Sequence, residues 1–195
     1  MFSNFLAPVL YVLKWILPAW IVYRSFWIVY QQHKKSAVKL KREILLFLLV
    51  AYIGSVVAVT IVPASIAGFN DPNAMRLNVL PIINTIKEYR QSLSEPNGTA
   101  TRAALENITG NLMLFIPMGI FLPLLFKNID SLKKVLIICL CCSISIEMTQ
   151  FFLRAFGTFR TADIDDLILN TVSGILGWLI YANIIRRYFY WLIKG

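Results

Sequence analysis

The sequence predicts an all-α integral membrane protein, a bundle of five transmembrane helices with one amphipathic helix in the outer loop. Of the 195 residues, 58% are hydrophobic and only 15% are charged, and the mean hydropathy is +0.68. A soluble domain of this size exposes more polar surface than so few charged residues supply, so the apolar excess must face lipid. Because a helix needs roughly 20 apolar residues to cross a bilayer, the chain has room for about five spans and little else.

The apolar stretches give the order of these spans. The first covers Phe5–Tyr30, where Lys14 and Arg24 interrupt it. Lys14 is expected either to snorkel to an interface or to face the bundle. The second to fifth spans are, in order, Ile44–Val62, Asn107–Phe126, Lys133–Leu153 and Leu167–Ile185.

The connections between the spans suggest how the chain is organised. Pro63–Glu106 is the one long loop, and apolar residues recur in it at helical spacing between Ile82 and Leu93. This pattern predicts a short amphipathic helix that lies on the membrane surface or caps the bundle. We therefore divide the chain into an N-terminal helix with a basic loop (1–43), a membrane domain (44–185) and a C-terminal tail (186–195).

The distribution of positive charge predicts the orientation. The net charge is +9, and most Lys and Arg lie in Gln31–Glu43, in Lys127–Lys134 and near the C-terminus. Cytoplasmic loops are enriched in these residues, so the N-terminus is expected outside and the C-terminus inside. The loops Pro63–Glu106 and Arg154–Asp166 then face outward. Because the charges lie in short runs between apolar stretches, the expected partners are membrane lipids, and nucleic acid is not expected.

Several kinds of chemistry find no support. The single histidine, His33, is predicted on the cytoplasmic side, which excludes a Ser-His-Asp or Cys-His arrangement on the outer side. Cys139, Cys141 and Cys142 lie in one apolar run and are expected to pack as small apolar side chains. The sequence has no Gly-rich phosphate loop and no zinc motif, so no cofactor is expected.

Polar side chains gather toward the outer ends of spans three, four and five. Span four carries Ser143, Glu147, Gln150 and Arg154 on one helical face, and span five carries Asp163, Asp166, Asn170 and Ser173 on one face. Gly174 and Gly177 adjoin the second face and would let a neighbouring backbone approach closely. An acidic side chain in the bilayer costs about 2.5–3.5 kcal/mol unless it is paired or wetted, so Glu147 needs compensation.

We call the resulting candidate site the polar cluster. Arg160, in the loop between spans four and five, is the expected partner of Glu147 or Asp163. Such residues often only join helices, and a metal ion on the carboxylates is a further alternative, but no recognised ligand spacing supports a metal. The number of polar groups at one depth favours a functional site. The polar cluster comprises Asn111, Glu147, Gln150, Arg160, Asp163, Asp166 and Asn170.

Four motifs in order resemble the signature of the bacterial VanZ-like family. They are Asn111-Leu-Met-Leu-Phe-Ile-Pro-Met-Gly119, Glu147-Met-Thr-Gln150-Phe-Phe, Arg160-Thr-Ala-Asp163-Ile-Asp165-Asp166 and Asn170-Thr-Val-Ser-Gly174-Ile-Leu-Gly177. The resemblance covers about Ile44–Tyr181, and Ser173 stands where Gly is common, which would loosen helix packing slightly. It implies a multi-pass protein of the bacterial cytoplasmic membrane, in a family named for a member associated with resistance to the glycopeptide teicoplanin.

Three functions fit these observations. The first is an outward polar pocket that binds an amphiphile: an envelope lipid, a cell-wall lipid precursor or a lipid-tailed antibiotic. The second is an intramembrane enzyme acting on a lipid headgroup, with Glu147 or Asp163 as general base. The third is a small transporter, for which the sequence offers no inverted repeat and no broken helix pair. Whether the protein is an enzyme is left open by the sequence.

Overall fold

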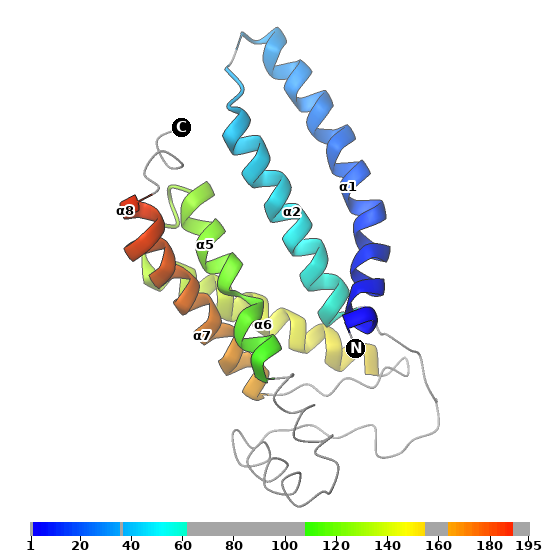
Figure 1. Ribbon diagram of the computed structural model, residues 1–195, viewed down its shortest axis with the longest axis vertical. Helices are drawn as coiled ribbons and strands as arrows, with labels where there is room; N and C mark the ends of the chain where they lie inside the picture. The colour runs from blue at the N-terminus through cyan, green and yellow to red at the C-terminus, as the bar shows by residue number, and fades with distance from the viewer. Residues whose placement is uncertain (1, 36, 62–107, 155–163, 189–195) are drawn as a thin grey trace, which may run out of the picture.

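The structure, a computed structural model, describes residues 2–35, 37–61, 108–154 and 164–188, and these form helices and short turns (Figure 1). Five helices are long and apolar enough to cross a membrane, which confirms the predicted all-α membrane fold. The predicted amphipathic helix lies outside the described residues. The elements are α1 (Phe2–His33), α2 (Leu40–Thr60), a helical segment at 108–114, α5 (Ile116–Leu125), α6 (Leu132–Arg154), α7 (Ile164–Ile180), a π-helical turn (Tyr181–Ile185) and α8 (Arg186–Tyr188).

The first connection is shorter than predicted. Gln31–Glu43 was expected to be a loop, but α1 continues to His33 and α2 already begins at Leu40. The predicted domain boundary at residue 44 therefore falls inside α2. The physical reason is that long polar side chains can extend from a helix end to the membrane interface, so a helix need not end where its apolar stretch ends.

The helices form two parts that meet along α2. Helices α5 and α6 both pack against α7, while α2 makes fewer contacts with α5. Helix α1 packs against α2 and against no other described helix to a comparable extent. Figure 1 shows α1 and α2 as an antiparallel pair that lies beside the group of α5, α6 and α7.

An ion pair joins the two helices of the N-terminal pair. The Nε and Nη2 atoms of Arg24 on α1 each donate to one carboxylate oxygen of Glu43 on α2, with an Nε–Oε2 distance of 2.8 Å. The guanidinium also lies 3.9 Å from the ring centroid of Trp27. The two charged side chains are only 14% and 15% exposed. A planar guanidinium can match a carboxylate in this two-bonded way, and a lysine cannot.

Lys14 takes a different position from Arg24. It is exposed on α1, with its Nζ atom 4.7 Å from the ring centroid of Tyr11 and 5.4 Å from that of Trp15. Because the Lys14 side chain is exposed, it does not face the bundle, and of the two alternatives only snorkelling to an interface fits this position.

We expect Arg24→Ala to weaken the attachment of α1 to α2. It leaves the Glu43 carboxylate without its guanidinium, at a cost of about 1.5–3 kcal/mol. A double-mutant cycle with Glu43→Ala, read by thermal unfolding in detergent, should give a coupling energy of about 1–3 kcal/mol. Lys133→Ala, which removes an exposed lysine from the first turn of α6, is the control and should change little. Additive effects of the two α1–α2 variants would contradict the direct coupling.

The third span is interrupted at Phe115, a feature that the sequence analysis did not predict. Residues 108–114 and 116–125 are helical, and Phe115 between them has φ −102° and ψ 3°. Pro117 has no backbone N–H to donate to the Met113 carbonyl, and in a continuous helix its ring would clash with that carbonyl, which accounts for the break. The interruption lies between α2 and α7, which both reach it with hydroxyl groups.

Two hydroxyl groups satisfy backbone atoms at this interruption. The backbone N–H of Phe115 donates to Ser173 Oγ on α7 over 2.9 Å, and Tyr52 on α2 donates its hydroxyl to the Leu114 carbonyl over 2.8 Å. Irregular backbone is tolerated in a membrane only where protein or water satisfies it. Span three is therefore held by side chains of both of its neighbours.

The crossing of α5 and α7 brings two backbones together at glycines. A Cβ atom added to Gly177 would overlap the Ile116 carbonyl oxygen and lie 3.0 Å from the Cα atom of Gly119. A Cβ atom added to Gly119 would overlap the Gly174 carbonyl oxygen. This confirms that Gly177 allows a neighbouring backbone to approach, as expected of small residues between membrane helices.

The apolar core lies just beside this crossing. Its fully buried members are Phe115, Val135 and Cys139, and the Cys139 side chain is the neighbour that Gly174 accommodates. Cys139 thus packs as the sequence predicts. Cys142 is partly buried, Cys141 is exposed, and neither forms a disulfide.

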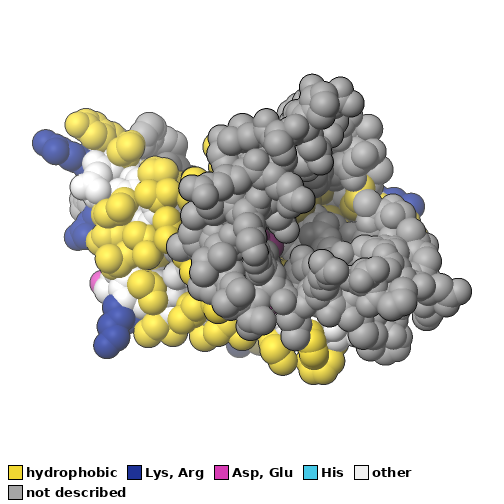
Figure 2. All heavy atoms as spheres, turned by 90° about the horizontal axis from the view of Figure 1, so that it is seen from below, with side chains coloured by type: hydrophobic (Ala, Val, Ile, Leu, Met, Phe, Trp, Pro, Cys, Tyr) yellow, Lys and Arg dark blue, Asp and Glu magenta, His cyan; other side chains and the backbone are white. Residues whose placement is uncertain are grey.

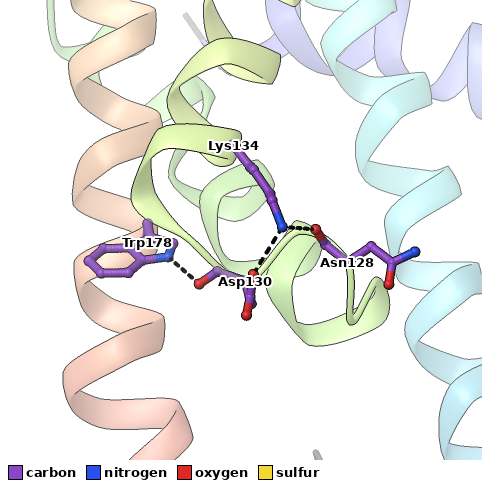
Figure 3. Close-up of polar contacts among 4 residues, drawn as sticks. All are labelled: Asn128, Asp130, Lys134 and Trp178. Atoms are coloured by element: carbon purple, nitrogen blue, oxygen red, sulfur yellow. Dashed lines mark hydrogen bonds and ion pairs between the residues drawn. The ribbon is translucent and has the colours of Figure 1, made fainter.

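The turn between α5 and α6 is fastened to α7 at the opposite end from the polar cluster (Figure 3). Lys134 Nζ donates to the Asn128 carbonyl over 2.7 Å, and Trp178 Nε1 donates to the Asp130 carbonyl over 3.3 Å. A hydrogen bond from its own backbone N–H, followed by one from Lys134, holds the pKa of the Asp130 carboxyl below its usual range. Because α6 begins directly after this turn, the turn sets how far along the bundle the polar face of α6 lies.

Candidate functional site

The described members of the polar cluster lie toward one end of the bundle, which we call the loop end. There α2 and α6 finish and α7 and the 108–114 segment begin. Figure 2 views this end and shows an acidic side chain near the middle of the face, with hydrophobic side chains along the flank. The structure brings Asn111, Asp166, Asn170, Glu147 and Gln150 toward this end on three different spans.

Asn111 and Asp166 are directly bonded. Asn111 Nδ2 on the third span donates to Asp166 Oδ1 in the first turn of α7. An acidic residue in a first turn also benefits from the positive end of the helix dipole. Both side chains take part in further interactions, so this bond is one part of a larger network.

Asn170 joins α7 to α6 one turn deeper. Its Nδ2 donates to Ser143 Oγ over 3.2 Å, and the exposed fractions of the two residues are 2% and 0%. Asn170 and Ser143 belong to the two polar faces that the sequence identifies separately. The structure shows that these faces meet, since α6 and α7 pack together along them.

Gln150 links α6 to α2. Its Nε2 donates to the Thr60 carbonyl over 2.9 Å, and Gln150 is 6% exposed. Thr60 is the last residue of α2, and the last four carbonyl groups of an α-helix have no partner within the helix. The Gln150 amide thus completes the end of α2, a role that the sequence does not reveal because the acceptor is a backbone atom.

Glu147 lies between these two contacts on the same face of α6. It is one turn from Ser143 and one turn from Gln150, it is half-buried, and it takes part in an interaction of its own. Its expected partner Arg160 lies outside the described residues, as does Asp163. The Glu147–Arg160 pair therefore stays a prediction.

Two further residues belong with the site although the predicted set omits them. Asp165 is 8% exposed and lies in the first turn of α7, and Ser173 is 0% exposed and accepts from Phe115. Asp165 is visible in the sequence as the middle acid of its motif. Ser173 was expected to loosen helix packing, but it is a hydrogen-bonded link between α7 and the third span. Among the described residues, no group of three or more His, Cys, Asp and Glu side chains is placed to hold a metal ion.

The comparisons with known proteins identify the family of this chain. A sequence model of the VanZ/LLP1 family matches residues 47–186, from α2 through the start of α8. The chain belongs to the VanZ/LLP1 family. The match includes every residue of the polar cluster and leaves out α1, Arg24 and Glu43. The resemblance noted in the sequence is thereby confirmed.

A member of the VanZ/LLP1 family with a curated description is similar to this chain. Protein VanZ of Enterococcus faecium is 36% identical over 108 residues, which are 55% of this chain and 62% of that protein. The chain thus spans less than two thirds of the length of this relative. No solved structure matches the chain significantly. Family membership together with five apolar helices makes this a multi-pass membrane protein of the VanZ type.

Proposed function

We propose that the polar cluster forms an outward-facing pocket for the head of an amphiphile, either an envelope lipid or a lipid-tailed antibiotic. The observation that supports this most is the buried set of Ser143, Gln150 and Asn170, which lies among apolar helices at the loop end. Burying so many polar groups in a membrane is costly and is typical of a site for a polar or charged group. The apolar flanks of α6 and α7 would accommodate the aliphatic part.

The proposed orientation follows from the positive charges. The end opposite the loop end carries Lys34, Lys133 and Arg186. Because Lys and Arg are enriched on the cytoplasmic side of membrane proteins, we place this end in the cytoplasm. The polar cluster then opens toward the cell wall. An impermeant thiol reagent should label a cysteine introduced at Gly157 and should not label one at Lys35.

The family points to glycopeptide resistance as the biological role. VanZ-like proteins are named for a member associated with teicoplanin resistance, and we propose the same association here. An antibiotic with a lipid tail partitions into the outer leaflet and can reach a site entered from the bilayer, whereas a tailless one cannot. The proposed pocket would therefore act on the lipid-tailed class.

We expect expression of this protein to raise tolerance to a lipid-tailed glycopeptide several-fold more than tolerance to a matched glycopeptide without the tail. Glu147→Gln and Arg160→Ala should remove that difference, because each removes a charge from the proposed head site. The measurement is the inhibitory concentration of each drug at equal protein levels. The matched control is Ser145→Ala, because Ser145 lies on the exposed face of α6 and its hydroxyl donates to the Cys141 carbonyl of the same helix. This variant should keep the difference in tolerance between the two drugs.

Equal protection against both drug types would remove the case for a site entered from the bilayer. Turnover of a labelled envelope lipid by the purified protein would support the enzyme instead. The interrupted third span does not by itself favour a transporter. Its freed backbone groups already have partners in Tyr52 and Ser173, whereas transporters use such groups to bind their substrate.

A further inference from the structure

The end of the bundle opposite the loop end carries a surplus of positive charge, and we call it the basic end. Among the described residues of this end, the acids are Glu43 and Asp130, and each is already paired, Glu43 with Arg24 and Asp130 with Lys134. Four further cations are exposed on the turn between α5 and α6, in the first turn of α6 and on α8: Lys127, Lys133, Arg186 and Arg187. No described acid at this end is left to neutralise them.

The π-helical turn at Tyr181–Ile185 sets the direction of Arg186. The backbone N–H of Arg186 donates to the Tyr181 carbonyl, five residues back, where an α-helix would use the fourth residue back. In an uninterrupted α-helix, which turns about 100° per residue, Arg186 would lie about 80° round the axis from Trp178. The wider π-helical turn rotates by a smaller angle per residue, so it brings Arg186 back toward the face that carries Trp178.

That face lies against the turn between α5 and α6. Trp178 Nε1 donates to the Asp130 carbonyl, and Figure 3 shows Trp178 and Lys134 reaching this turn from two different helices. The Asp130 backbone N–H and Lys134 hold the pKa of the Asp130 carboxyl below its usual range, and the positive charge of Arg186 adds to their effect. Arg186 therefore lies near this turn, which Lys133 directly follows in the first turn of α6.

We infer that Arg186, brought to this turn by the π-helical segment, forms with Lys133 a site for the phosphate of an anionic phospholipid. The turn joins two apolar spans, so its charged side chains lie at the depth of the lipid headgroups. A guanidinium can donate two parallel hydrogen bonds to a phosphate, and a lysine adds a point charge. Basic pockets between the ends of membrane helices bind anionic headgroups in this way. The site is separate from the polar cluster, so this inference goes beyond the proposed function.

The test compares lipids with the same tails and different head charges. Purified protein in detergent is titrated with dioleoyl phosphatidylglycerol and with dioleoyl phosphatidylcholine, and bound lipid is counted by native mass spectrometry. Both heads contain a phosphate, but only phosphatidylglycerol has a net negative charge. It should bind at least about tenfold more tightly, since a cation near an anionic head contributes roughly fivefold and two take part. An excess of inorganic phosphate should not displace it, and displacement would show a site for a free anion and overturn the lipid.

Neighbouring arginines connect this preference with the site. Arg186→Gln should lower the preference roughly fivefold, and Lys133→Gln should act in the same direction. The matched control is Arg187→Gln, which removes the same charge from the next residue of the chain. Arg187 points about 100° further round the helix, and its guanidinium lies 5.7 Å from the ring centroid of Tyr188. This control should keep most of the preference.

The outcomes also separate this inference from the proposed function. Equal affinity of the wild-type protein for the two lipids would overturn the anionic site and would leave the polar cluster untouched. If Arg186→Gln and Arg187→Gln lowered the preference equally, the net charge of this end would account for binding, and the built site would be wrong. Glu147→Gln should leave the lipid preference unchanged, although it should remove the difference in drug tolerance.

Discussion

Gly177→Ala is expected to separate α5 from α7 and to cause a large loss of stability. The added methyl group would overlap the Ile116 carbonyl oxygen, and this neighbour is backbone that cannot rotate away. Overpacking usually costs about 1–3 kcal/mol, and a clash with backbone belongs at the upper end of this range. Because Phe115 and the core residue Cys139 lie beside this crossing, the shift would also disturb the core and the third span.

Thermal unfolding of the purified protein in detergent measures this effect. Gly110→Ala is the matched control, since a Cβ atom at Gly110 meets nothing within 4 Å. Alanine also favours a helix by about 1 kcal/mol over glycine, so the control should be neutral or slightly stabilising. If Gly177→Ala unfolds at the same temperature as Gly110→Ala, the close crossing of α5 and α7 is wrong.

Ser173→Ala should produce the second large effect. It removes the acceptor of the Phe115 backbone N–H at the interruption of span three, where Phe115 is only 1% exposed. A buried donor left without a partner costs about 1–3 kcal/mol, and no bulk water is present in a bilayer to replace the bond. We expect the interruption to loosen, because only Tyr52 would still hold it.

Hydrogen exchange at residues 113–118 would locate this loosening, and thermal unfolding would give its size. Ser145→Ala is again a suitable control, because the Ser145 hydroxyl donates only to a carbonyl of its own helix. Ser173→Thr keeps the acceptor and should restore much of the protection if the added methyl group is tolerated. Unchanged exchange in Ser173→Ala would show that the Phe115 N–H has another partner.

The polar site could be predicted in part. Helical spacing alone placed Ser143, Glu147 and Gln150 on one face of α6 and Asp166 and Asn170 on one face of α7. Spacing within a helix does not say which residue of one helix lies opposite which residue of the next. The Asn170–Ser143 and Asn111–Asp166 bonds depend on the relative position of the helices, which packing decides.

By itself, the sequence determined the five spans, their order and the family. Apolar length sets how many helices can cross a bilayer, and this property needs no knowledge of neighbours. Only the tertiary structure decided the pairing of Arg24 with Glu43, the hydrogen bond of Phe115 with Ser173 and the contact of Gln150 with Thr60. The reason is physical. Each of these features joins groups far apart in the chain, and two of them use backbone atoms, which every residue has and which no pattern of side chains can mark.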